Sequence, residues 1–114
     1  MTDFELETQN LARSSHEALI LAILADGPRH GYQLALEIED RSDGSFRFNH
    51  GTLYPILHKL EKQGLIEGVW SNEGPRGKRK SYALTDAGRE FAKTQRESWF
   101  RFIEHLQSAI GEAE

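Results

Sequence analysis

The chain has 114 residues, a formal net charge of −4 and no cysteine, with 38% hydrophobic and 28% charged residues. This length suits one domain, or one domain with an arm, and the composition is globular rather than disordered. The lack of cysteine excludes disulfides and zinc sites with thiolate ligands. No apolar run approaches the roughly 20 residues of a membrane span, and the acidic start of the chain is unlike a signal peptide. We therefore expect a cytoplasmic protein without a membrane partner.

The first part of the chain predicts an arm and two helices. Residues 1–13 are polar with scattered apolar side chains, which is typical of an arm or a frayed helix. Ser14 or Ser15 can cap the first helix, and residues 18–25 are apolar all round, which predicts a central helix covered on every side. The turn formers at 26–28 end it. A second helix is predicted from about His30 to Arg41.

The segment that follows predicts a turn, a short strand and a third helix. Residues 42–45 are turn formers, and Phe46-Arg47-Phe48 alternates like a strand. Asn49 is a good N-cap, and Gly64 stands where a left-handed residue would close the helix between them. The buried stripe of this helix has the i, i+3, i+4, i+7 spacing and consists of Leu53, Ile56, Leu57 and Leu60.

The opposite face of the third helix offers hydrogen-bond donors, an aromatic hydroxyl and a cation. Gly51 adds no side chain, so the backbone at the start of the helix can approach another surface closely. A helix that is apolar behind and polar in front fits the major groove of DNA, which admits one α-helix. The polar face consists of His50, Thr52, Tyr54, His58 and Lys59.

Two strands and a last helix complete the chain. Residues 65–70 and 79–84 are predicted as antiparallel strands, and the turn formers at 72–78 form the tip of their hairpin. Basic residues concentrate at this tip, where they would contact phosphates; they are Arg76, Lys78, Arg79 and Lys80. Thr85 caps the last helix, with Asp86 in its first turn.

The last helix carries an apolar stripe that a small domain cannot cover. A leftover stripe of this kind predicts a seam between two copies of the chain. The seam residues are Trp99, Phe102, Ile103, Leu106 and Ile110. A ligand pocket around Trp99 would leave the same pattern in the sequence as a packed seam, so both interpretations stay open.

The order of elements predicts a mainly α fold with a small β-hairpin, namely a winged helix-turn-helix followed by a long C-terminal helix. The predicted parts are an arm at 1–13, a DNA-binding domain at 14–84 and a dimerisation helix at 85–114. In this arrangement the third helix enters a groove and the hairpin lies along the DNA backbone beside it.

At this point the chain resembles the PadR family of transcriptional regulators, from about Leu19 through the final helix. The combination is specific: His-Gly-Tyr at 30–32, Gly-Thr-Leu-Tyr-Pro at 51–55, Leu-Glu-Lys-Gln-Gly-Leu-Ile at 60–66, and Arg-Lys-Ser-Tyr-Ala-Leu-Thr at 79–85. His50 departs from the pattern, because the family often has a small residue or proline there.

The resemblance implies a homodimeric repressor that binds double-stranded DNA and releases it when a small, often aromatic, effector binds. The single helix after the hairpin is similar to the compact branch of the family, in which that helix forms the dimer interface and an aromatic residue on it can line a ligand cavity. Trp99 occupies the comparable place. Tyr32 is expected to add a phosphate contact from the second helix, and two-fold symmetry implies a palindromic operator.

Other functions find less support in the sequence. The acidic total charge favours an alternative, a winged-helix module that binds proteins and not DNA. No nucleophile is arranged with a base and no glycine-rich nucleotide loop precedes a helix, so no enzyme and no cofactor are predicted. No two of the five histidines have the i, i+4 spacing of a metal clamp, so no metal site is predicted either.

Overall fold

A computed structural model of the chain describes residues 15–71 and 79–111. Helix 15–24 is followed by β1 (Arg29–His30), α2 (Gly31–Arg41), α3 (His50–Lys62), β2 (Ile66–Ser71), β3 (Arg79–Leu84) and α4 (Asp86–Ile110). The predicted arm at 1–13 and the hairpin tip with Arg76 and Lys78 lie outside the described residues. The predicted class, mainly helical with a small antiparallel sheet and a long last helix, is confirmed.

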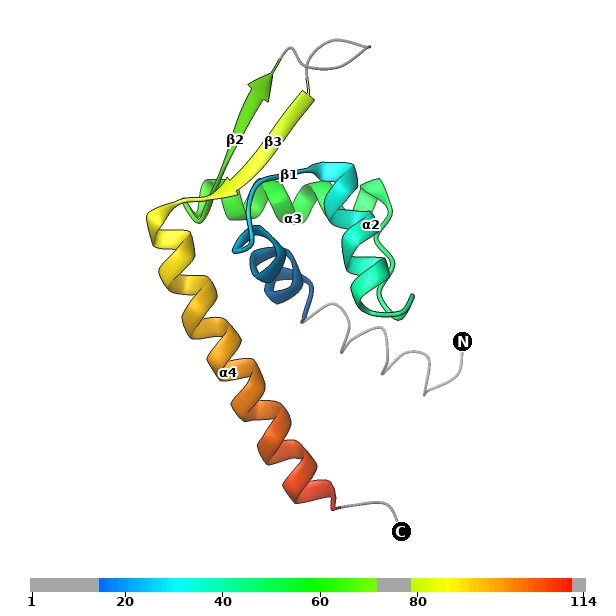
Figure 1. Cartoon of the computed structure of the whole chain (residues 1–114). Coiled ribbons are helices and arrows are strands. Elements are labelled where there is room, and N and C mark those ends of the chain that lie inside the picture. Colours follow the sequence, from blue (N-terminus) through cyan, green and yellow to red (C-terminus); the bar gives the residue numbers. More distant parts are fainter. Residues whose placement is uncertain (1–14, 72–78, 112–114) are drawn as a thin grey trace.

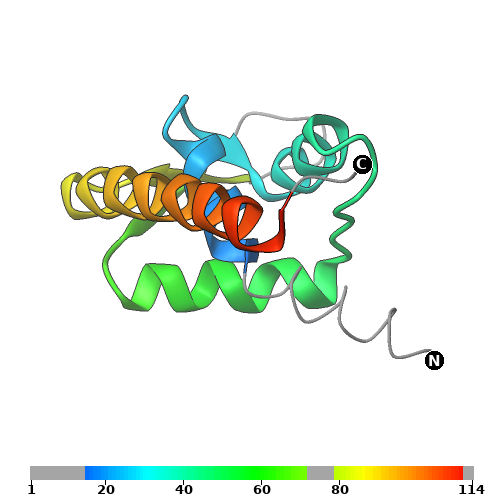
Figure 2. The ribbon, with the colours of Figure 1, turned by 90° about the horizontal axis from the view of Figure 1, so that it is seen from below.

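Three helices surround the core, and the hairpin and α4 extend from it in different directions (Figure 1). Seen from below, α4 crosses in front of helix 15–24, with α2 to one side and α3 to the other (Figure 2). The largest fully buried side chains come from these three helices: Ile20, Leu21, Leu34, Ile38, Leu53, Leu57 and Leu60.

Helix termini follow the local sequence closely. The Asn49 side chain accepts a hydrogen bond from the Thr52 backbone N–H at 2.8 Å, which fixes the start of α3. Gly64 has a φ of 75°, so the α3 helix ends in the left-handed conformation that glycine adopts without strain. Thr85 caps α4 by accepting from the Gly88 N–H at 3.0 Å. These caps fix the starts of α3 and α4 at the positions that the sequence predicted.

The sheet contains one strand that the sequence did not indicate. Its order is β1-β3-β2, and β1 is a two-residue strand in which Arg29 pairs with Tyr82 and His30 with Ser81. The predicted strand at Phe46-Arg47-Phe48 is wrong, because this segment is irregular. The alternation has a different cause: Phe46 and Phe48 turn inward and pack against the core without a partner strand.

Helix 15–24 is not covered on every side, contrary to the prediction. Ile20, Leu21, Ile23 and Leu24 are buried, but Ala22 and Ala25 are exposed. The face that carries Ala22 looks onto an open cleft beside α4 and not onto a further packed layer. The apolar sequence therefore exceeds what one copy of the chain can bury.

Candidate nucleic-acid interface

An ion pair lies on each side of the outward face of α3. On one flank Lys59 contacts Glu17 of helix 15–24 at 2.8 Å, and on the other Glu61 contacts Lys80 of β3 at 2.9 Å. Each pair fixes one long side chain of α3 against a neighbouring element. The exposed residues between the two flanks are Gly51, Pro55, His58 and Lys62.

Lys62 was missed by the sequence reasoning although it lies on this face. It is exposed in the last turn of α3, four residues after His58, and has no ion pair with the residues that the structure describes. The i, i+4 spacing from His58 was the signal that could have found it. Lys59, which was predicted as a contact, remains 60% exposed but shares its charge with Glu17.

The first turn of α3 presents two stacked rings. His50 and Tyr54 lie 5.5 Å apart between ring centroids, with 7° between their planes. Tyr54 reaches the start of α2, where a Cβ on Gly31 would stand 2.7 Å from its hydroxyl oxygen. Gly31 therefore leaves the space that Tyr54 needs, and the starts of α2 and α3 form one surface.

Arg79 and Tyr32 extend this surface toward the hairpin. The Arg79 guanidinium donates to the Tyr32 hydroxyl at 3.2 Å and lies 5.6 Å from the ring centroid. The Tyr32 ring also stacks with that of His30, at 6.0 Å between ring centroids. Arg79 is exposed and has no acidic partner among the described residues, so its charge is available to a ligand.

Lys80 is arranged differently from its neighbour. Successive side chains of a strand point to opposite faces, and Lys80 points toward α3, where Glu61 accepts its hydrogen bond. This hydrogen bond raises the pKa of Lys80 above its ordinary value, and burial raises the pKa of the nearby Tyr82 hydroxyl. The predicted basic cluster is therefore divided in the structure: Arg79 on one face, Lys80 on the other, and Arg76 and Lys78 outside the described residues.

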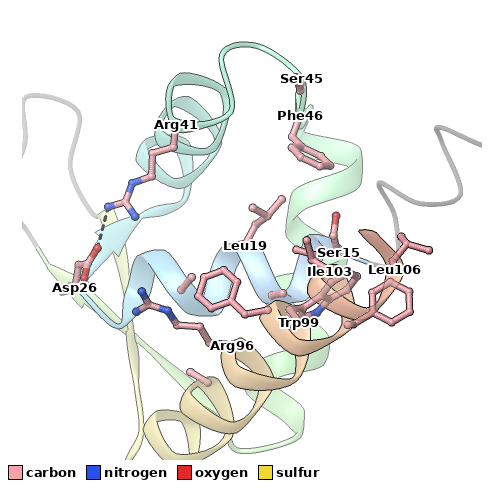
Figure 3. A pocket seen from close by; sticks show the side chains of 15 residues that line it. Ser15, Leu19, Asp26, Arg41, Ser45, Phe46, Arg96, Trp99, Ile103 and Leu106 are labelled. Atoms are coloured by element: carbon pink, nitrogen blue, oxygen red, sulfur yellow. Dashed lines mark hydrogen bonds and ion pairs between the residues drawn. The ribbon is translucent and has the colours of Figure 1, made fainter. Parts of the chain in front are cut away.

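A second candidate site is an open cleft of about 790 Å³ between helix 15–24 and α4. Trp99 meets Phe102 edge-to-face at 5.9 Å in its wall, and Figure 3 shows Trp99 across the cleft from Leu19. Arg41 and Asp26, which pair at 2.9 Å, and Arg96 add charge to the lining. Of the predicted seam residues, four line this cleft, namely Trp99, Phe102, Ile103 and Leu106, whereas Ile110 lies beyond it and is 75% exposed.

The described residues contain neither a metal-binding cluster nor a membrane-spanning helix. Within 15–71 and 79–111, no group of three acidic or histidine side chains is placed to hold a metal ion. No helix of the same ranges is long and apolar enough to cross a membrane.

Comparison with known proteins identifies the chain's relatives. The transcriptional regulator YqjI of Escherichia coli (strain K12) is 38% identical over 79 residues, which are 69% of this chain and 36% of that protein. The negative transcriptional regulator PadR of Bacillus subtilis (strain 168) is 30% identical over 71 residues, 62% of this chain and 39% of that protein. The chain thus spans little more than a third of the length of these two relatives.

The likeness to solved structures covers nearly the whole chain. A PadR family transcriptional regulator from Eggerthella lenta superimposes with a TM-score of 0.82 and 26% identity, over 96% of this chain and 94% of that one. Residues 20–94 match the model of the transcriptional regulator PadR-like family, and this range contains α2, α3, the hairpin strands and the start of α4. The chain therefore belongs to the PadR-like family of transcriptional regulators, which are winged-helix DNA-binding proteins and not enzymes.

Proposed function

We propose that this chain is a homodimeric repressor that places α3 in the major groove of a palindromic operator and responds to a small aromatic effector. The observation that carries the DNA-binding part is the continuous surface from the first turn of α3 to Arg79. It joins a helix face with two stacked rings to an arginine without an acidic partner among the described residues.

The residues divide into two roles on a duplex. His50, Gly51, Tyr54 and His58 project from α3 toward base edges, with Thr52 and Lys59 at its flank. Arg79, Tyr32 and the hairpin residues Arg76 and Lys78 contact phosphates, which position the protein without reading the sequence. A regulator that binds DNA works where the genome lies, which supports a cytoplasmic location.

The proposal of a dimer is supported by the second half of α4. Every residue from 101 to 110 is exposed in the single chain, including Phe102, Ile103, Leu106 and Ile110. An apolar stripe of this size on a regulator is typical of a protein–protein seam. A two-fold dimer would set two copies of α3 about 34–36 Å apart, one turn of DNA. Repression is favoured by the similarity to the Bacillus subtilis relative, which is a negative transcriptional regulator.

The effector is proposed to bind beside Trp99, in the cleft that a second copy would narrow. Its lining combines aromatic rings with two arginines, Arg41 and Arg96. Binding would count as allosteric if the effector preferred one spacing of the two α3 helices over another. Quenching of Trp99 fluorescence by added aromatic compounds, in a Trp70→Phe background, tests for such a ligand.

The DNA-binding part is tested by anisotropy with a labelled duplex from immediately upstream of the protein's own gene. Arg79→Ala is expected to weaken binding to every duplex and to flatten the log–log salt dependence by about 0.9, the value for one lost phosphate contact. Arg101→Ala, which removes the same charge from the exposed second half of α4, is the matched control. Equal affinity and slope for Arg79→Ala and wild type would contradict the assignment.

One observation favours the alternative, a protein-interaction module. Two cations predicted to contact DNA, Lys59 and Lys80, are already paired with carboxylates. This alternative predicts no affinity for the duplex even at low salt, together with a protein partner that binds when the hairpin is deleted.

A further inference from the structure

Lys80 is enclosed by the hairpin and α3 on several sides. Its ammonium group lies 2.9 Å from Glu61 Oε1, and both side chains are 26% exposed. The same nitrogen stands 5.2 Å from the ring centroid of Tyr82 and 5.8 Å from that of Trp70. The ammonium group is therefore partly desolvated, and the carboxylate and the two aromatic rings already satisfy its charge within the protein.

The glycine at position 68 makes this arrangement possible. A Cβ on Gly68 would collide with Cε of Lys80, so any other residue there would displace the lysine side chain. Gly68 is also the residue of β2 that pairs with Tyr82. The aliphatic part of the Lys80 side chain therefore crosses β2 where Gly68 has no side chain, and so reaches α3.

The position of this contact along the hairpin has a mechanical consequence. At its base the hairpin is joined to α3 through residues 63–65, and β3 is held to β1 by pairing at Ser81 and Tyr82. Lys80 pairs with Trp70, four residues above the first residue of β2, and its side chain adds a direct attachment to α3 at that height. Without this contact, α3 would be joined to the hairpin only at the base, and the angle between the two elements would be less restricted.

We propose that Lys80 and Glu61 form a clamp that holds the hairpin at a fixed position relative to α3, and that Lys80 is a positioning residue and not a phosphate contact. The expected effect of this clamp on DNA affinity rests on the proposed DNA-binding function. The clamp would place Arg79 at the distance from α3 at which both Arg79 and α3 reach one duplex.

The two possible roles of Lys80 predict opposite effects of the same substitution. If Lys80 contacted phosphate, Glu61 would weaken that contact, and Glu61→Gln would tighten binding and steepen its salt dependence. If the pair is a clamp, Glu61→Gln releases the hairpin and weakens binding although a negative charge has been removed from the DNA-facing helix. The sign of the change decides between them.

We expect Glu61→Gln and Lys80→Met each to weaken binding to the upstream duplex about fivefold, the size of effect expected for a partly exposed ion pair. Lys80→Met is expected to keep the wild-type salt slope, whereas Arg79→Met, the matched control on the opposite face of β3, flattens it by about 0.9. The double variant Glu61→Lys, Lys80→Glu restores the pair with reversed charges and is expected to recover most of the affinity. Tighter binding by Glu61→Gln, or a flattened slope for Lys80→Met, would overturn the proposal.

A measurement without DNA separates this proposal from the proposed function. In a Trp99→Phe background Trp70 is the only tryptophan, and Glu61→Gln is expected to increase its quenching by acrylamide because Lys80 no longer covers the ring. If wild type binds no duplex but the quenching changes as expected, the DNA-binding function fails and the clamp remains. If wild type binds and the quenching does not change, the clamp fails.

Discussion

The two helices that carry regular apolar stripes, α3 and α4, have opposite surroundings. In α3 the stripe residues Leu53, Leu57 and Leu60 are at most 1% exposed, because helix 15–24 and α2 complete the core around them. In α4 only Gly88 and Ala92 are buried, and Ile103 and Leu106 remain more than 40% exposed.

This difference separates what an apolar stripe specifies from what it leaves open. Apolar residues at the same helical spacing form a finished core in α3 and an uncovered surface in α4. Gly88 shows where the transition lies, since a Cβ there would collide with the Leu65 carbonyl oxygen at the base of the hairpin. The first turns of α4 are fixed to the domain by this close approach, and the later turns project from it (Figure 1).

The largest effect is expected for substitutions in the exposed stripe of α4, where we propose that a second copy of the chain binds. Ile103→Asp together with Leu106→Asp would place two unpaired carboxylates in the proposed seam, at a cost of several kcal/mol for each buried charge. We expect sedimentation to show a monomer whose circular dichroism retains the helical signal of the winged-helix domain. Arg101→Asp, on the opposite side of α4, introduces the same residue and should leave the dimer intact. A dimer that survives the double substitution would place the seam elsewhere.

The core around α3 should respond to a single truncation without involving a partner. Leu57 is 0% exposed, so Leu57→Ala leaves a cavity and is expected to lower the free energy of unfolding by about 2–5 kcal/mol. Urea unfolding at two protein concentrations measures this loss. Ile110→Ala, which truncates a residue 75% exposed in the single chain, serves as the comparison. A loss for Ile110→Ala that matches that of Leu57→Ala at both protein concentrations would mean that α4 belongs to the same core, whereas a loss that changes with concentration belongs to the proposed seam.

The elements that the sequence predicted well are those with local causes. Asn49, Gly64 and Thr85 act through hydrogen bonds or backbone angles within a few residues, so the ends of α3 and the start of α4 followed from the local sequence alone. The two-residue strand β1 was not predictable in this way, because it exists only through its pairing with β3, about 50 residues later in the chain.

The exposed residues of α3 were predictable in part, since Lys62 was missed, but the directions of the hairpin cations were not. The residues of α3 were chosen from helical spacing, and the structure places them at or beside its exposed face. Arg79 and Lys80 were assigned one role because they are adjacent and basic. The alternation of a strand separates them, and whether the second meets a carboxylate depends on how the hairpin packs on α3.

The smallest expected effect is a loss of folding stability at alkaline pH, and it concerns the contact between the hairpin and α3. The pKa of Lys80 is raised, mainly by its hydrogen bond to Glu61, so the folded state favours the charged lysine more than the unfolded state does. The resulting stabilisation is complete below the unfolded pKa and is lost as pH rises through the folded one. Burial raises the pKa of Tyr82, and deprotonation of this hydroxyl removes stability in the same direction.

Urea unfolding between about pH 9 and pH 12 should therefore show wild type losing more stability than Glu61→Gln, by about 0.2–1 kcal/mol, because only wild type has the ion pair to lose. Tyr82→Phe removes the second titrating group and should reduce, but not abolish, the difference between wild type and Glu61→Gln, because Glu61 also raises the pKa of Tyr82. Since the lost contact joins the hairpin to α3, the dimer that we propose for α4 should persist over this pH range at micromolar concentration. If the dimer dissociated over the same pH range in which the ion pair is lost, the core around α3 and the proposed seam on α4 would be coupled. The contrast between a finished core and a separate seam would then be wrong.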